Sequence, residues 1–304
     1  MDRWAAAAAA ALLIGWAALG MMESRRLDEA KAATPVKSDA SRSRLPDDAP
    51  EMLIGAYGGK HYSYPSDVRF RRFGPGPLRD FTVKDVAWEG QSFKHPLYYG
   101  ARVARWGQGG EGPGRFGGMV DFIHSKAIAQ MGQELRLEGR LDGKPVPDKA
   151  RIGDLFSKLE FSHGHNMLLF TGLMRLASLV PRVSPYVGLG AGVSFPHTEI
   201  HITKSDPTRT YEYQFTGPAV QGLAGVEFRL PRVSLFLEYK FTFATYSAPL
   251  TGREGTYFPQ DVYLQIRRWL SGEAPAGGYA DTRLSSHQLI GGLGVRVGGP
   301  VPAN

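Results

Sequence analysis

The sequence contains no cysteine, which excludes disulfides, thiolate metal sites and cysteine nucleophiles. Beyond residue 20 it also has no apolar run long enough to cross a membrane as a helix. Charged residues make up only 21% of the chain and form no blocks. An exported protein that has neither disulfides nor spanning helices needs another source of rigidity. A β-sheet closed on itself by hydrogen bonds in lipid would supply it.

Glycine and aromatic residues are plentiful instead, with 38 glycines and 11% aromatics, and this composition is typical of β proteins rather than helical ones. The net charge of +7 favours a polyanionic partner, which could be nucleic acid or the phosphates of lipopolysaccharide. Export, if it occurs, argues against nucleic acid. We therefore expect no nucleic-acid partner.

The N-terminus carries the signals of export. An apolar run from Trp4 to Gly20 follows Arg3, and Ala30-Lys31-Ala32 offers a small-x-small cleavage site. We predict a signal peptide over 1–32, with an uncleaved N-terminal anchor as the alternative. Residues 33–51 are polar and contain three prolines, which predicts a disordered linker before a barrel over 52–298 and a tail over 299–304.

Alternation of apolar and polar residues recurs through the rest of the chain and predicts strands of about ten residues. The pattern occurs eight times, at 53–63, 95–106, 116–127, 162–175, 185–197, 213–229, 232–246 and 285–297. The connections alternate between long (64–94, 128–161, 198–212, 247–284) and short (107–115, 176–184, 230–231). We therefore predict an all-β fold, an eight-stranded antiparallel transmembrane β-barrel of the outer-membrane type, with short periplasmic turns and long extracellular loops.

The fifth of these segments shows the alternation most clearly. Val187, Leu189 and Val193 fall on one face, whereas Gly188 and Gly190 fall on the other. In a membrane barrel the large residues face lipid and the small ones face a narrow lumen. A soluble barrel such as a lipocalin would reverse the faces. Charged residues on the inner face, including Asp121, Arg102, Glu238 and Lys240, suit a hydrated lumen with charge pairing.

All eight histidines lie near strand ends that this topology places outside the cell. Parity places His124, Lys126, His197 and Glu199 on the outer wall together with Asn166. It directs His163 and His165 toward the lumen. Imidazoles and carboxylates of this kind can hold a divalent metal or transfer protons, and a hydrated rim without function is the alternative. Cations at the same level can bind lipid phosphates.

Several segments, in order, resemble the lipid A oxidase family of outer-membrane barrels. They are MLIGAYGGKHYSYPSDV, WEGQSFKHPLYYGARVARW, MVDFIHSKA, LEFSHGHNMLLFTGLMR, SPYVGLGAGVSFPHTEI, YEYQFTGPAVQGLAGVEFRL and SLFLEYKF, and they cover most of residues 52–246. The resemblance implies an enzyme that uses molecular oxygen to oxidise the proximal glucosamine of lipid A to an aminogluconate unit. The chain departs from it in the 247–284 loop, at His165 and in the ending GGPVPAN, which lacks a terminal aromatic residue.

We therefore expect a monomeric outer-membrane protein that acts on lipid A in lipopolysaccharide, with oxygen as co-substrate and a divalent metal as a cofactor of undefined identity. The alternatives are a non-enzymatic barrel that binds lipid or forms a small pore, and a hydrolase using Ser162, His163 and Glu160, which would need a bulge to converge. The catalytic candidates are His124, His163, Asn166, His197 and Glu199. The substrate-binding candidates are Lys126, Lys94, Glu160, His165, Glu238 and Lys240.

Overall fold

The computed structural model describes residues 51–72, 79–107, 115–141, 143–177, 180, 182–202 and 209–297. The expected signal peptide, nearly all of the expected linker and the C-terminal tail lie outside these ranges. The first strand begins at Glu51, one residue before the expected start of the barrel.

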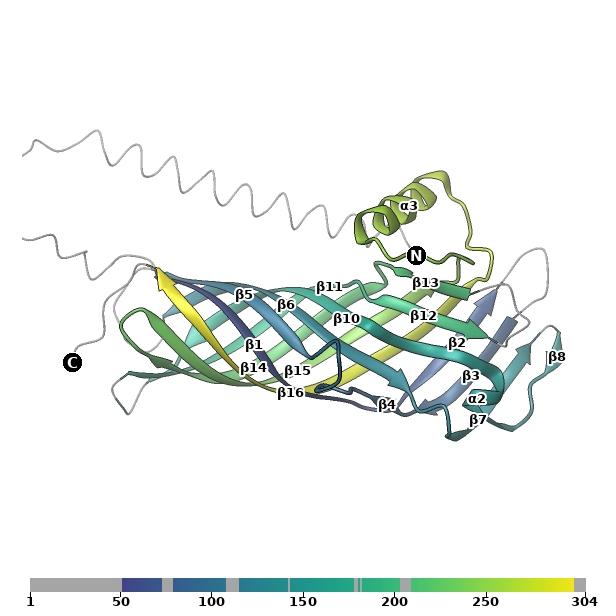
Figure 1. The fold of residues 1–304 in the computed structure, drawn as a ribbon, viewed down its shortest axis with the longest axis horizontal. Helices are drawn as coiled ribbons and strands as arrows, with labels where there is room; N and C mark the ends of the chain where they lie inside the picture. The colour runs from purple at the N-terminus through teal and green to yellow at the C-terminus, as the bar shows by residue number, and fades with distance from the viewer. Residues whose placement is uncertain are drawn as a thin grey trace, which may run out of the picture. The chain divides into compact units, whose positions relative to one another are not determined.

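Eight antiparallel strands form a closed ring (Figure 1). In ring order they are β1 (Glu51–Ser63), β5 (Tyr99–Trp106), β6 (Phe116–Ala129), β10 (Phe156–Arg175), β11 (Val183–Ser194), β14 (Gly217–Arg229), β15 (Val233–Pro249) and β16 (Tyr279–Val297). Strand β16 pairs with β1, so the ring has no open edge. Each of the eight segments found by alternation corresponds to one strand of this ring, which confirms the predicted eight-stranded barrel.

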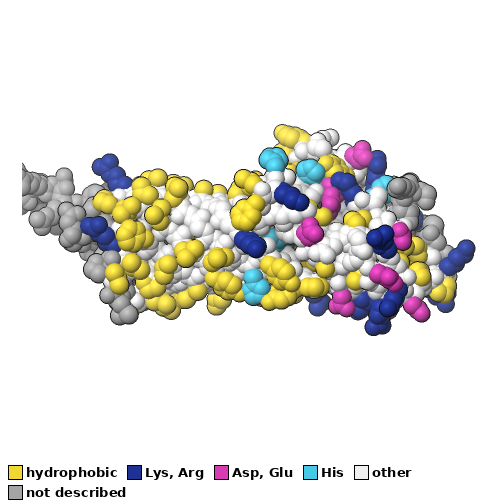
Figure 2. All heavy atoms as spheres, turned by 60° about the horizontal axis from the view of Figure 1, so that its bottom comes forward, with side chains coloured by type: hydrophobic (Ala, Val, Ile, Leu, Met, Phe, Trp, Pro, Cys, Tyr) yellow, Lys and Arg dark blue, Asp and Glu magenta, His cyan; other side chains and the backbone are white. Residues whose placement is uncertain are grey.

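The large apolar side chains of the ring point outward, as the alternation predicts. Leu189 of β11 is 79% exposed, whereas the neighbouring Gly188 and Ser194 are buried. An exposed apolar belt of this extent is incompatible with water and typical of a barrel surrounded by lipid. Figure 2 shows hydrophobic side chains over much of the barrel's length, with acidic residues gathered toward one end. The belt includes Ile54, Val103, Phe116, Leu189, Val220, Val226, Leu235, Leu237, Phe241, Leu289, Leu293 and Val295.

Charged side chains fill the lumen. The Arg102 guanidinium donates to both oxygens of Glu238 at 2.9 Å, and Lys240 donates to Asp121. Nearer the short turns, Glu51 accepts hydrogen bonds from three buried arginines, Arg115, Arg175 and Arg229. The predicted charge pairing is therefore present. These groups are almost fully buried, so within the described strands they plug the lumen instead of lining a hydrated channel, which disfavours the pore alternative.

The four long connections all leave the same end of the barrel, which we call the loop end, and they carry structure that the alternation did not predict (Figure 1). They contain β2 (Ser66–Arg72), β3 (Arg79–Val86), β4 (Trp88–Glu89), β7 (Glu134–Leu141), β8 (Lys144–Pro145), β9 (Lys149–Arg151), α2 (Ile152–Leu155), β12 (His197–Ile202), β13 (Arg209–Tyr213) and α3 (Phe258–Ser271). Strands β2, β3 and β7 extend the barrel sheet from β16, and the β12–β13 hairpin extends it from β10.

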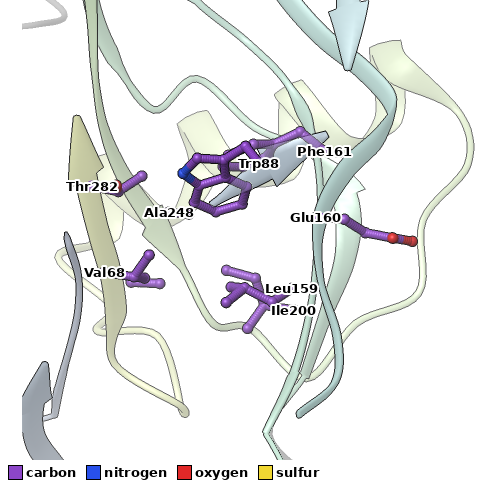
Figure 3. Close-up of a pocket in the computed structure, with 9 residues that line it drawn as sticks. Val68, Trp88, Leu159, Glu160, Phe161, Ile200, Ala248 and Thr282 are labelled. Carbon is purple, nitrogen blue, oxygen red and sulfur yellow. The ribbon is translucent and has the colours of Figure 1, made fainter. Parts of the chain in front are cut away.

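An apolar core closes the barrel at the loop end. Phe70, Phe81 and Phe156 stack there, and Trp88 packs on Phe161. The core contains a cavity of about 10 Å³, in which Val68, Leu159 and Ile200 point toward one another while the Glu160 carboxylate points away (Figure 3). A cavity of this size holds about one water molecule, so it is a packing defect and not a substrate pocket.

Helix α3 lies beside β13 (Figure 1), and its polar residues Asp261 and Gln265 are buried. Asp261 accepts a hydrogen bond from the backbone of Tyr213 at 3.1 Å, and Gln265 bonds both backbone groups of Phe215 at 2.8 Å. The opposite face exposes Tyr263, Ile266 and Leu270, of which Leu270 is 85% exposed. No helix in the described ranges has the length and hydrophobicity needed to cross a bilayer.

Candidate functional site

A bulge in β10 changes which side chains face outward. Phe161 pairs with Ala127 and His165 with Ser125, so four steps along β10 match two along β6. The extra residues are accommodated at Gly164, whose φ of +141° is strained for any residue with a side chain. The prediction that parity turns His163 toward the lumen is therefore wrong. The bulge places it on the outer wall instead.

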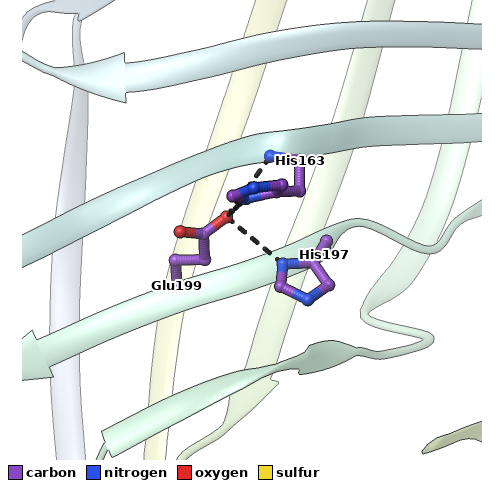
Figure 4. A group of neighbouring side chains, drawn as sticks. All are labelled: His163, His197 and Glu199. Carbon is purple, nitrogen blue, oxygen red and sulfur yellow. Dashed lines mark hydrogen bonds and ion pairs between the residues drawn. The ribbon is translucent and has the colours of Figure 1, made fainter. Parts of the chain in front are cut away.

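Three side chains converge there, one from β10 and two from β12 (Figure 4). Glu199 Oε1 lies 3.2 Å from His197 Nδ1 and in close contact with His163 Nδ1. One ligand atom from each of the three residues lies within 4.8 Å of the others. His197 and Glu199 are 2% and 0% exposed, whereas the side chain of His163 is 52% exposed. The cluster is thus buried on one side and open on the other.

Neighbouring groups orient these side chains. Lys158 Nζ donates to Glu199 Oε2 at 2.7 Å, which leaves Oε1 for the imidazoles. Ser162 Oγ donates to Oε1 at 2.8 Å. His197 Nε2 lies 3.1 Å from the carbonyl oxygen of Gly255, which fixes the ring. Burial alone would raise the pKa of Glu199, but hydrogen bonds from His197 and Lys158 outweigh it and hold the pKa below its ordinary value.

His124 and Asn166 form a second pair on the same wall. They are cross-strand neighbours, and His124 Nδ1 lies 2.8 Å from Asn166 Oδ1. The Tyr99 ring stacks on His124 with centroids 4.5 Å apart. The five catalytic candidates therefore lie on the outer wall in two groups, one of three residues and one of two.

The remaining candidates are divided between the outer wall and the lumen. Lys126 donates to the backbone carbonyl of Lys94, in the loop before β5, at 2.8 Å, and Glu160 lies 3.3 Å from Lys158. Lys126 and Glu160 therefore lie on the outer wall, with the backbone of Lys94 beside them. His165 does not join them, because it packs inside on Phe161 and Tyr246.

Glu238 and Lys240 also belong to the lumen. Their polar partners are Arg102, Asp121 and the hydroxyl groups of Tyr57 and Tyr186. Both are almost fully buried, so neither is placed to touch a lipid from outside.

An open groove of about 500 Å³ adjoins the cluster. Lys158 and Tyr211 line it and also touch the cluster, since the Tyr211 ring centroid lies 5.7 Å from that of His163 and 4.5 Å from that of His197. Arg209 adds a second cation, paired with Glu254 at 2.5 Å. The groove is suited to an anionic group beside the histidines.

Sequence reasoning did not identify Lys158 or Tyr211. The sequence nevertheless contains an alternating pattern around each of these two residues. Lys158, Glu160 and Ser162 alternate along one face, and Tyr211, Tyr213 and Phe215 alternate along another. They fell in segments that were expected to be loops.

Comparisons with known proteins add little. No family model matches the sequence, and no curated protein matches it. Among solved structures, the crystal structure of Neisserial surface protein A (NspA) matches with a TM-score of 0.32 and 10% identity, covering 81% of this chain and 96% of that chain. A superposition this loose carries no argument, so the fold and the candidate site rest on the geometry of the chain itself.

Proposed function

We propose that this protein is a bacterial outer-membrane enzyme that oxidises lipid A, converting the proximal glucosamine to an aminogluconate unit with molecular oxygen. The observation that carries the proposal is the convergence of His163, His197 and Glu199 on the outer wall, next to the cationic groove. A site on that wall is open to a lipid of the surrounding leaflet. All three residues lie in segments that resemble lipid A oxidases, LEFSHGHNMLLFTGLMR and SPYVGLGAGVSFPHTEI.

An amphipathic substrate fits the surroundings of the site. Lys158 and Arg209 can bind phosphate in the groove. Below them an aromatic series links the barrel wall to α3, with Phe122 6.1 Å from Phe195 and Phe195 5.6 Å from Phe258. Acyl chains would lie against these rings while the sugar lies at the histidines. This arrangement favours a lipid with an anionic sugar head group over a soluble sugar.

The oxidation removes two electrons from C1 of the glucosamine. The C1–H and O–H bonds of the ring hemiacetal break, a C=O bond forms, and oxygen takes up two electrons and two protons to become hydrogen peroxide. Hydrolysis of the resulting lactone opens the ring to the acid. His163 is the exposed member of the cluster, and we assign it the position nearest the sugar.

Acyl hydrolysis is less well supported. The bulge does bring Ser162 to Glu160 and to His163, at 3.2 and 3.3 Å. Ser162 and Glu199, however, both contact the same nitrogen of His163, Nδ1. A serine triad needs the serine on one ring nitrogen and the carboxylate on the other, so that the ring can pass a proton between them.

Mass spectrometry of lipid A from an outer-membrane host with and without the protein tests the proposal. Expression should add one oxygen atom to the proximal sugar, with the lactone as the dehydrated form. His163→Ala and Glu199→Gln should each lower the oxidised fraction at least about 100-fold, the scale on which disturbing the groups that position a reaction lowers its rate.

His287→Ala is the matched control, because this histidine lies against Tyr64 and Phe241 and belongs to neither group on the site wall. Heat-modifiable migration would confirm equal folding of all variants. Loss of an acyl chain would show that the protein is a hydrolase and not an oxidase. Unchanged lipid A would indicate a non-enzymatic barrel that binds lipid.

A further inference from the structure

We propose that His163, His197 and Glu199 bind one divalent transition-metal ion through His163 Nδ1, His197 Nδ1 and Glu199 Oε1. Glu199 Oε1 contacts both imidazoles at Nδ1, that of His197 at 3.2 Å, and one ligand atom from each of the three residues lies within 4.8 Å of the others. The residues come from two neighbouring strands, β10 and β12. Two imidazoles and one carboxylate with open positions form the donor set typical of ferrous iron in oxygen-using enzymes. Fe²⁺ is accordingly the ion that the site fits.

The hydrogen bonds of His197 call for a cation at this point. The carbonyl oxygen of Gly255 can only accept, so the His197 nitrogen that faces it, Nε2, carries the hydrogen. In the neutral ring Nδ1 then presents a lone pair to Glu199 Oε1 at 3.2 Å. Two buried acceptors at this distance repel each other unless a proton or a metal ion lies between them. A metal ion between His197 Nδ1 and Glu199 Oε1 would be bound by both atoms and would remove this repulsion.

The neighbouring contacts are those of a metal centre. A histidine that binds a metal through one ring nitrogen usually donates the N–H of the other nitrogen to an acceptor, which fixes the tautomer. In His197, Nε2 faces the carbonyl oxygen of Gly255 in this way. Lys158 performs the same task for the carboxylate by binding its other oxygen.

Open coordination positions face the groove. The side chain of His163 is half exposed, and Tyr211 and Lys158 connect the cluster to the groove. Three protein ligands leave further positions for water or for small molecules that arrive from the groove. The other occupant of the gap between His197 and Glu199 is a proton, which would make His197 an imidazolium paired with the carboxylate. The metal-binding site and the protonated ion pair can be distinguished by their response to added metal.

The proposal depends on the three side chains and not on the substrate, so it can be tested without lipid A. The full-length protein, folded in detergent micelles and stripped with a chelator, would be titrated with Co²⁺ as a spectroscopic probe and loaded anaerobically with Fe²⁺ for elemental analysis. We expect one equivalent of either ion per chain. Co²⁺ should produce visible d–d absorption.

His163→Ala and Glu199→Gln should each weaken binding at least about 100-fold. Because His163 is exposed, its replacement should not disturb folding, so that variant remains informative even if Glu199→Gln is unstable. His287→Ala is the control and should retain one equivalent. Wild-type protein that binds no metal above the level of His163→Ala would overturn the proposal and leave His197 as an imidazolium. Metal binding without lipid A oxidation would retain the metal site while refuting the proposed function.

Discussion

Gly164 determines where His163 points. Its positive φ allows β10 to insert two extra residues opposite β6, and the strand resumes its normal alternation at His165. A β-carbon at this position would lie 2.6 Å from the Asn166 amide, which is bonded to His124. The absence of a side chain at Gly164 therefore matters for both groups of candidate residues: it permits the bulge that carries His163, and it leaves room for the Asn166 amide beside His124.

Replacing Gly164 tests this role directly. Gly164→Ala should lower the free energy of unfolding by about 1–3 kcal/mol, the cost of holding a side chain in a sparsely populated conformation. It should also reduce lipid A oxidation, since a misplacement of about 1 Å near the chemistry costs about 100-fold. Urea titration in micelles and mass spectrometry of lipid A would measure the two effects.

Gly172→Ala in the same strand is the control for that change. A β-carbon at Gly172 meets nothing closer than 3.8 Å, and no positive φ is involved. Equal activity in the two variants would show that the bulge does not position the site.

At the scale of the element, helix α3 has its apolar side outward. Its polar residues Asp261 and Gln265 bond the backbone next to β13, whereas Tyr263, Ile266 and Leu270 remain exposed. A helix that packed on a core would have the reverse arrangement. The apolar side matches the exposed belt of the barrel in character, and both suit contact with lipid.

Gln265 makes two of the hydrogen bonds that hold α3 beside β13. Gln265→Ala should loosen the helix, because it leaves the N–H and C=O of Phe215 without their partners at a cost of about 1–3 kcal/mol each. Limited proteolysis in micelles should then cleave within 250–278, while the barrel stays resistant. The exposed Gln260 offers a matched control, and equal cleavage of Gln260→Ala and Gln265→Ala would contradict the assignment.

At the scale of the whole molecule, a polar lumen lies inside an apolar belt. Lys240 and Asp121 are both fully buried in it, alongside the Arg102–Glu238 pair. In such a lumen each charge depends on its partner, because no water can replace it. The barrel is thus a rigid support for a site on its outer face and not a conduit.

Asp121→Asn should lower the free energy of unfolding by about 3–5 kcal/mol, because it removes the nearer of the two carboxylates beside the buried Lys240 ammonium and leaves only Glu238, which also pairs with Arg102. The double variant Asp121→Asn, Lys240→Met should recover part of this loss, since it removes the excess positive charge. Urea unfolding in liposomes measures both. A double variant less stable than the single one would mean that the two residues are not coupled as a pair.

The sequence predicts the ring well because every ring strand has a lipid face and a lumen face, so residues such as Leu189 and Gly188 alternate. The same rule fails for His163, since one bulge reverses the parity of every residue inside it. It also fails for α3, whose apolar side faces outward and marks no core. Lys158 and Tyr211 come together only through the β12–β13 hairpin, and pairing of that kind is not encoded locally.

The position of the candidate site on the wall, and not in the lumen, has a kinetic consequence. A lipid substrate reaches such a site by two-dimensional diffusion and leaves the same way, without entering water. The relevant concentration is then the mole fraction of that lipid in the leaflet. At a fixed total amount of substrate, added detergent or inert phospholipid dilutes the surface and slows turnover, just as removal of substrate would.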